Sequence, residues 1–230
     1  MTLAIDRWGA SQYLLQSTFL KYVGAMMRPG GPFAMPESEP EKVPGYWRDI
    51  DQSRTEARRL LRKAGVPDGF SFVLKSRQLE PHISAGVYLI DQWRQVGLKV
   101  EHHILETGPW TQDLRTGNYE VISDFMGEFL EDPDLLLLKY MSSDKNPLNY
   151  GGYTDRVLDD LYDRQSREPD TEKRKQLVWE FERRLLSEQV YLIQLLWRQR
   201  IIIHWAKFKG WKITPSPYPG QDLVDVWLAE

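Results

Sequence analysis

The sequence contains no cysteine and only four histidines. The lack of cysteine excludes disulfide bonds, thiolate nucleophiles and cysteine-ligated zinc, but it leaves the cellular compartment open. No H-x-x-x-H or H-E-x-x-H spacing occurs, and the adjacent His102 and His103 point to opposite faces of a predicted strand, so we predict no metal site. The phosphate-binding patterns G-x-x-x-x-G-K-[ST] and G-x-G-x-x-G are also missing, and we expect no cofactor.

Long apolar runs and an excess of positive charge are missing as well. No run approaches the roughly 18 apolar residues of a transmembrane helix, and the first residues lack the pattern of a signal peptide. The net charge of -3 gives no basic footprint for nucleic acid. What is present is an ordinary globular composition with nine Trp and eleven Tyr, a surplus that suits a pocket packing flat against a ligand.

Helical and strand periodicities alternate along the chain and predict an α/β fold. A strand, a helix and a second strand near the middle form a βαβ unit. The predicted helices span 5–27, 53–63, 81–96, 107–114, 134–141, a segment capped by Thr154 or Asp155, and 171–187. The predicted strands span 69–74, 98–105, 120–124, 191–197, 200–205 and a short piece around 211–213, followed by a last apolar piece at 223–228.

Local signals set the ends of several of these elements. Ser53-x-x-Glu56 has the form of a capping box and predicts a helix start, and Gly65 is placed to end that helix. The next helix has a predicted apolar face of Ile83, Val87, Ile90 and Trp93 or Val96 and is expected to stop at Gly97. A Pro/Gly-rich, charged segment at 28–45 predicts a connector.

The third predicted strand is followed directly by a stretch of acids, glycine and aromatics, and a turn rich in Asn, Gly and Tyr lies further on at 146–155. The carboxyl end of such a strand is where an α/β sheet places its ligand site, although a solvated strand-to-helix connection has the same pattern. The same acids are also compatible with a second function, a carboxylate-based hydrolase that uses Glu128 with Asp132 or Asp124, because acid–base catalysis needs two carboxylates in different environments. Asp132-Pro-Asp134 is equally a good helix start.

Several stretches resemble the C-terminal half of the family 5 extracytoplasmic solute-binding proteins, the oligopeptide-, dipeptide- and nickel-type receptors of ABC importers. The most specific is Glu56–Phe70, which is similar to the family's A-x-x-L-L-x-x-A-G-[YVF]-x-[DN]-G-F segment. The other stretches follow in family order: Ala4–Arg7, Gln92–Val100, Trp110, Gly117–Glu120, Asp132–Asp134, Asn149–Tyr153 and Arg174–Leu177.

This resemblance implies a periplasmic-binding-protein-like lobe of the class II type, with βαβ units and a mixed sheet, that closes on its ligand by hinge motion. It implies three parts: residues 1–45 as a helix and connector from the hinge side, 46–197 as the second ligand-binding lobe, and 198–230 as a segment that crosses back to a missing N-terminal first lobe. A ligand, that first lobe and a membrane permease would be the partners, and the location would be periplasmic or extracytoplasmic. The tail and the first helix would leave apolar surface exposed in this chain alone.

One departure from the family pattern concerns the ligand. Peptide-binding members resemble W-x-x-D ahead of the D-P-D motif, and that Asp pairs with the peptide ammonium. Here Phe129 takes the Asp position, and Glu128 reaches it only after a one-residue shift. A sugar, an opine or another polar solute therefore stays open beside a peptide. We expect a ligand site, with no catalytic residue, formed by Asp124, Glu128, Phe129, Asn149, Tyr150 and Tyr153.

A third interpretation is that the chain stands alone as an interaction module. It would act through the surface that a partner lobe otherwise covers.

Overall fold

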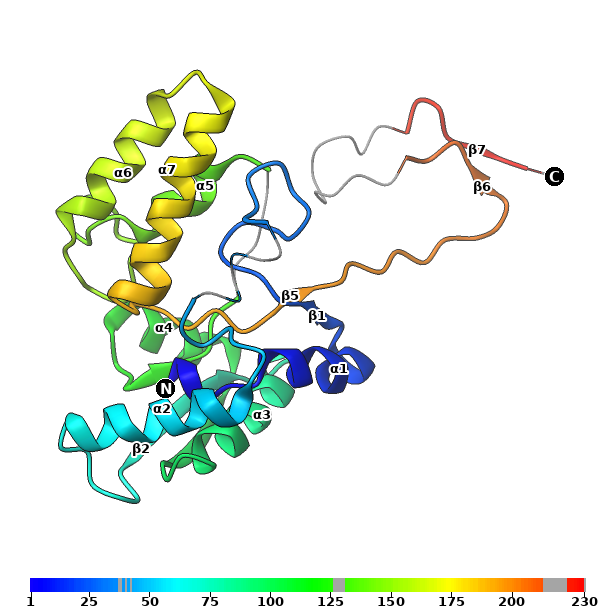
Figure 1. Cartoon of the computed structure of the whole chain (residues 1–230). Helices are drawn as coiled ribbons and strands as arrows, with labels where there is room; N and C mark the ends of the chain where they lie inside the picture. The colour runs from blue at the N-terminus through cyan, green and yellow to red at the C-terminus, as the bar shows by residue number, and fades with distance from the viewer. Residues whose placement is uncertain (37–38, 40, 42, 126–130, 213–222, 230) are drawn as a thin grey trace.

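The computed structural model describes residues 1–36, 39, 41, 43–125, 131–212 and 223–229. A sheet flanked by helices, a separate layer of helices, and an extended C-terminal tail follow one another in Figure 1. The helices are α1 (Arg7–Thr18), α2 (Ile50–Lys63), α3 (His82–Arg94), α4 (Thr107–Thr116), α5 (Pro133–Leu137), α6 (Arg156–Arg167) and α7 (Thr171–Arg183). The strands are β1 (Leu20–Tyr22), β2 (Ser71–Arg77), β3 (Lys99–Leu105), β4 (Val121–Ile122), β5 (Trp197–Arg198), β6 (Phe208–Lys209) and β7 (Trp227–Leu228). Single helical turns are η1 (Thr2–Ala4), η3 (Leu138–Tyr140) and the π-helical η4 (Arg184–Glu188).

A three-stranded parallel sheet in the order β3-β2-β4 forms the centre of the fold. Leu74 of β2 aligns with His102 of β3 on one side and with Val121 of β4 on the other. Phe72 and Trp93 pack edge to face with centroids 5.4 Å apart and anchor α3 on the sheet. The predicted βαβ unit is confirmed, and parallel and antiparallel pairing both occur, but in separate sheets.

The helices α5, α6 and α7 form a second layer with its own core. Leu137, Leu158, Phe181 and Leu185 are fully buried there. Asp155 accepts hydrogen bonds from the amides of the first turn of α6, so of the two predicted caps it is the one used. Within the described residues, no helix is both long and apolar enough to span a bilayer.

The predicted helix over 5–27 is too long. Asp6 caps α1 as expected, but the helix ends at Thr18 because Phe19 adopts the left-handed conformation, with φ of 61°. The chain then turns into β1, which pairs antiparallel with β5. The end of α1 is therefore set by pairing with a strand almost 180 residues away, which local periodicity cannot register.

The capping box at Ser53 is also wrong. The helix α2 begins three residues earlier, where Asp49 accepts from the amide of Gln52 at 2.9 Å. Ser53 is buried and donates to the carbonyl of Leu3 at 2.8 Å, and Glu56 instead bonds to Arg59. Gly65 and Gly97 do end their helices, with φ of +70° and +90°.

The buried face of α3 is rotated from the prediction. Val87 is 56% exposed, whereas Ala85, Leu89 and Trp93 are buried. Gly86 lies against the His102 ring, because the close approach of α3 to β3 leaves no room for a side chain there.

The predicted strands over 191–197 and 200–205 are wrong apart from β5, and no ladder forms over 200–205. The C-terminal tail, residues 199–229, holds instead the short antiparallel pair β6–β7. The strand expected around 211–213 is wrong over its described part, because β6 ends at Lys209, before Trp211; Ile213 lies outside the described residues. None of the described tail residues is buried, and the tail reaches away from the body of the molecule in Figure 1.

Arg7 joins three distant segments near the start of α1. Its side chain is 1% exposed, and Nε donates to the carbonyl of Gln194 at 2.8 Å. One Nη donates to the carbonyl of Gly45, and the other donates to the Thr2 hydroxyl at 3.0 Å. The guanidinium also lies over the Tyr46 ring, 4.3 Å from its centroid. Burial lowers the pKa of Arg7, and these acceptors compensate for the lost hydration.

Candidate ligand-binding site

The candidate site begins where the chain leaves β4. Ser123 follows this strand, and its hydroxyl lies 3.3 Å from His82 Nδ1 and 3.2 Å from the Ser76 hydroxyl. Trp110 Nε1 donates to the Ser123 carbonyl at 3.1 Å. Burial lowers the pKa of His82, against an opposing effect of the Asp124 charge. These bonds from α3, α4 and β2 fix the direction in which the next residue, Asp124, points.

Asp124 lies in a small cluster of charged and aromatic side chains. Its Oδ2 is 2.5 Å from Lys139 Nζ, and the two side chains are 28% and 23% exposed. The Lys139 ammonium lies 5.3 Å from the centroid of the Tyr150 ring, within cation–π range. The structure therefore brings Asp124 and Tyr150 together, with Lys139 between them.

Tyr119 fixes the backbone behind this cluster. Its hydroxyl donates to the Tyr150 carbonyl at 2.6 Å. Burial and the nearby Asp124 charge raise the pKa of Tyr119, so the phenol keeps its proton and remains a donor at neutral pH. Phe125, which follows Asp124, is 51% exposed and offers an open aromatic surface beside the charged pair.

Asn149 and Tyr153 hold the neighbouring loop. Asn149 is buried, and its amide donates to the carbonyls of Met141 and Tyr153 at 2.8 and 3.1 Å. Tyr153 stacks on Tyr191 at 3.7 Å with an interplanar angle of 5°, and its hydroxyl donates to the Tyr140 carbonyl at 2.9 Å. Both side chains position the loop that carries Tyr150. Their contact with a ligand stays a prediction, and Glu128 and Phe129 lie outside the described residues.

The acids ahead of α5 are held in ion pairs. Asp132 caps α5 by accepting from the Asp134 amide at 2.9 Å. Arg174 Nη2 lies 2.9 Å from Asp132 and 3.1 Å from Asp134. Burial opposes ionisation of Asp132, but Arg174 and the Asp134 amide outweigh it and keep the pKa of this carboxyl low. A general acid needs the opposite shift, so this geometry favours the helix-start interpretation of Asp132.

The described residues contain no group of three or more His, Asp or Glu side chains arranged to hold a metal ion. His102 and His103 do lie on opposite faces of β3: His102 is packed against α3, and His103 reaches Glu101 at 2.7 Å.

Sequence reasoning missed Lys139, Tyr119 and Phe125. Lys139 is the single charged residue within the run Leu135–Tyr140, and this isolation was the available signal. An ion pair between Arg28 and Glu131 also brings the connector next to the residues just ahead of α5. No local pattern in the sequence links these two positions.

A parallel α/β lobe whose central strands end at a charged and aromatic surface is the architecture of a ligand-binding lobe. The model for the bacterial extracellular solute-binding proteins, family 5 Middle, matches residues 1–147. The chain belongs to this family.

Solved structures show the same fold at low sequence identity. One is the Helicobacter pylori periplasmic binding protein DppA in complex with the peptide STSA, with 19% identity and a TM-score of 0.76 over 100% of this chain and 43% of that chain. The dipeptide-binding protein of Pseudoalteromonas sp. SM9913 in complex with Met-Leu has 17% identity and a TM-score of 0.77, over 99% and 44%. The Escherichia coli murein tripeptide-binding protein MppA has 18% identity and a TM-score of 0.73, over 100% and 44%.

These matches confirm the predicted lobe fold. This chain spans less than half the length of each of these solved chains. A search of curated protein sequences found no match.

Proposed function

We propose that this chain is the C-terminal part of the receptor of an ABC importer. The receptor captures a peptide-like or other small polar solute between two lobes outside the cytoplasm and delivers it to a membrane permease. Family membership over residues 1–147 and the binding-protein fold over the whole chain support this proposal. It is a binding function, with no bond made or broken.

The observation that carries the proposal is the cluster of Asp124, Lys139 and Tyr150 at the carboxyl end of β4. It offers both signs of charge beside aromatic surface, and such polar groups orient a small solute while rings cover its apolar parts. Glu128 and Phe129 belong to the same loop in the sequence and complete the proposed site. Asn149 and Tyr153 hold the backbone of the loop that carries Tyr150.

We assign residues 46–197 to the second lobe, 1–45 to the hinge side, and 198–230 to a segment that packs on the missing first lobe. Exposed apolar side chains of the tail support this division: Ile203 is 93% exposed, Trp205 81% and Val224 90%. Side chains of this type gain stability only against another surface. The first lobe of the same receptor is the partner proposed for them.

The proposed site is tested in the two-lobe protein, in which this chain is combined with its proposed first lobe. The protein is titrated calorimetrically with the peptides Met-Leu and STSA. Tyr150→Ala removes the ring beside Lys139 and is expected to weaken binding by about tenfold or more, the effect of losing about 1.4 kcal/mol. Phe70→Ala is the matched control, because Phe70 is 46% exposed and precedes the opposite end of β2. Equal affinities for wild type and Tyr150→Ala would reject the site.

The proposal that this chain is one part of a two-lobe protein is tested separately, by the mass of the protein in its own host. A species of roughly twice 27.0 kDa is expected. A species of 27.0 kDa would favour the second candidate, an interaction module acting through the apolar tail. Sedimentation of that species alone and with a separately expressed first lobe then shows whether the tail self-associates or binds the lobe.

A further inference from the structure

The strand β3 lies at one edge of the central sheet, away from the proposed ligand site. Among the described strands it pairs with β2 alone, in the order β3-β2-β4. The amide of Lys99 donates to the Phe70 carbonyl at 2.9 Å, and the carbonyl of Leu105 accepts from the Gln78 amide at 2.7 Å. Successive residues of a strand direct their backbone groups to alternate sides. The odd-numbered residues of β3 therefore bond to β2, and its even-numbered residues point to the open side.

The open side of β3 consists of the backbone groups of Val100, His102 and Ile104. Within the part of the chain that the structure describes, no other segment donates to or accepts from these groups. Such a row of amides and carbonyls is a template for another strand. Ile104 is 44% exposed and Val100 is half-buried, so apolar side chains accompany the open backbone.

An apolar stripe on α3 lies beside this edge. Gly86 lies against the His102 ring, and Ile83 and Ile90, three residues before Gly86 and four after it, are its neighbours on the helix surface. Val87 belongs to the same stripe and is 56% exposed. We call Ile83, Val87 and Ile90 the α3 stripe. It has the periodicity of a buried face, yet it is partly open to solvent.

The opposite side of α3 is already covered by α1 and the residues that precede it. The Tyr88 hydroxyl donates to the Asp6 carbonyl at 2.7 Å, and Gln92 Oε1 accepts from the Asp6 amide at 3.0 Å. Tyr88 also stacks on Tyr13 of α1, with ring centroids 6.0 Å apart. Because α1 occupies this side, the α3 stripe faces the side of the open β3 edge.

We propose that the open edge of β3 and the α3 stripe form an interface with a second copy of this chain. The two β3 strands pair antiparallel about a twofold axis at His102, which places Val100 opposite Ile104 of the second copy. Each even-numbered residue then donates one backbone hydrogen bond to the second copy and accepts one. The sheet continues across the axis, and the two α3 stripes meet on the same face.

The charged side chains of β3 favour this occupant and this register. Glu101 and His103 are exposed and lie on either side of the axis, so Glu101 of one copy is opposite His103 of the other. His103 Nε2 already reaches Glu101 Oε1 at 2.7 Å within one chain. An axis at Glu101 or at His103 would instead pair two like side chains, which is destabilising. Edge charges prevent pairing where they repel, whereas here they complement each other.

The interface is tested by sedimentation equilibrium of the purified chain over a range of concentrations. A reversible dimer of 27.0 kDa chains is expected. Val87→Glu places a charge on the α3 stripe of both copies and is expected to raise the Kd of the dimer about tenfold or more. Val157→Glu is the matched control, because Val157 is 50% exposed on α6 in the other layer, and it should leave the Kd unchanged. A chain that is monomeric at every concentration, or a Val87→Glu dimer as tight as wild type, overturns the proposal.

The register is tested by exchanging the charges of Glu101 and His103. His103→Glu places like charges opposite each other on both sides of the axis and is expected to raise the Kd about fivefold or more. Adding Glu101→Lys restores opposite charges, and the Kd should return to within about threefold of wild type. A double variant that dimerises no better than His103→Glu contradicts the proposal.

Amide hydrogen exchange identifies the surface directly. The amides of Val100, His102 and Ile104 are expected to exchange fast in the monomer and about tenfold or more slowly in the dimer, whereas those of Glu101 and His103 stay protected by β2 throughout. Self-association that leaves the three amides unprotected would assign the contact to another surface, such as the C-terminal tail, and overturn the proposal. Protection that arises only when a separately expressed first lobe is added would assign the edge to that lobe, and would also overturn it.

Discussion

The body of the molecule and its tail contain similar apolar residues in opposite environments. In the body, Leu158 and Phe181 are fully buried, whereas Ile203 and Val224 in the tail are at least 90% exposed. The body has a parallel sheet and three clusters of buried apolar residues, while the described part of the tail has one ladder of two residue pairs. The body is therefore stabilised by contacts within this chain, whereas these apolar side chains of the tail face solvent.

The largest expected contrast comes from deleting an apolar side chain in each region. Phe181→Ala leaves a cavity in the α5–α7 core and is expected to lower the free energy of unfolding by about 3–5 kcal/mol. Ile203→Ala removes side-chain atoms that already face solvent and is expected to change it by less than about 0.5 kcal/mol. Urea unfolding of both variants measures the contrast, and comparable losses would show that the tail packs on the body in solution.

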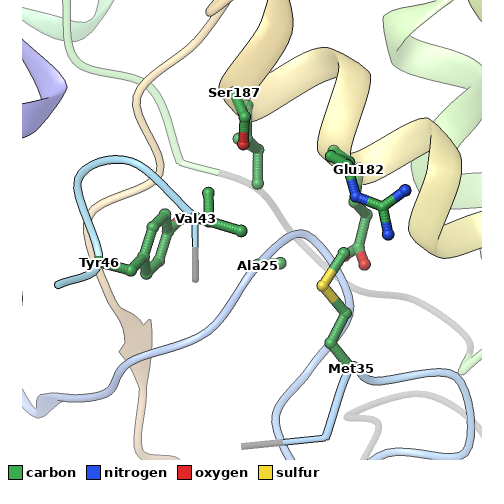
Figure 2. Close-up of a pocket in the computed structure, with 8 residues that line it drawn as sticks. Ala25, Met35, Val43, Tyr46, Glu182 and Ser187 are labelled. Atoms are coloured by element: carbon green, nitrogen blue, oxygen red, sulfur yellow. The ribbon is translucent and has the colours of Figure 1, made fainter. Parts of the chain in front are cut away.

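The next effect concerns a charge that only the body buries. Burial raises the pKa of Glu182 to about 8 from 4.5, despite the opposing bond from the Met27 amide. Tyr46, the residue after the connector, and Arg183, on the same helix, are ionisable residues that line a small pocket together with Glu182 (Figure 2). The native state holds a proton that the unfolded chain releases, so stability is complete below about pH 4.5 and falls as pH rises to about 8.

Glu182→Gln should remove this dependence, which amounts to about 1.4 kcal/mol per unit of pKa shift. Urea unfolding from pH 5 to pH 9 measures it, and Glu180→Gln, at an exposed position of the same helix, is the control that should keep the slope. A wild-type stability that does not decrease over this range would contradict a neutral Glu182.

A smaller effect is expected at the start of α2, where the structure and the capping-box pattern disagree. Asp49→Ala removes the side chain that accepts from the Gln52 amide and is expected to cost about 1 kcal/mol. Glu56→Ala removes only an exposed ion pair with Arg59, so a loss below about 0.5 kcal/mol is expected. A larger loss of stability in Glu56→Ala than in Asp49→Ala would instead support a helix start at the capping box of Ser53 and Glu56.

The smallest effect on stability is expected at Trp205, which is 81% exposed. Trp205→Ser should leave the unfolding of this chain within about 0.5 kcal/mol of wild type. In the proposed two-lobe receptor the same change should weaken association with the proposed first lobe, because an apolar anchor is lost. Sedimentation of the mixed lobes checks this, and unchanged association would remove Trp205 from the interface.

The sequence was sufficient where local signals and tertiary packing agree. The βαβ unit, the cap at Asp155 and the ends of helices at Gly65 and Gly97 all follow from turn chemistry and periodicity. The family resemblance rested on short motifs in order, and it predicted the lobe that the structure shows.

Prediction was wrong where contacts between residues far apart in the sequence determine the ends or the existence of an element. The end of α1 at Thr18 depends on pairing of β1 with β5, and the strand pattern at 200–205 finds no partner strand in the described residues. In the candidate site, Asp124 was expected from its position after β4, and Tyr150 from the turn at 146–155 that is rich in Asn, Gly and Tyr. Lys139 was missed because its proximity to Asp124 depends on how α5 and η3 pack, and periodicity along one segment does not contain that information.

Arg7 gives the fold a single mechanical joint. Its guanidinium donates to backbone carbonyls at Thr2, at Gly45 in the connector, and at Gln194 shortly before the tail. A pull on the tail is therefore borne first by the pairing of β5 with β1, and next by Arg7, which passes it to the connector and the N-terminal turn. In a force-extension experiment the joint should yield in one step, separating all three segments together while the helical layer is still intact.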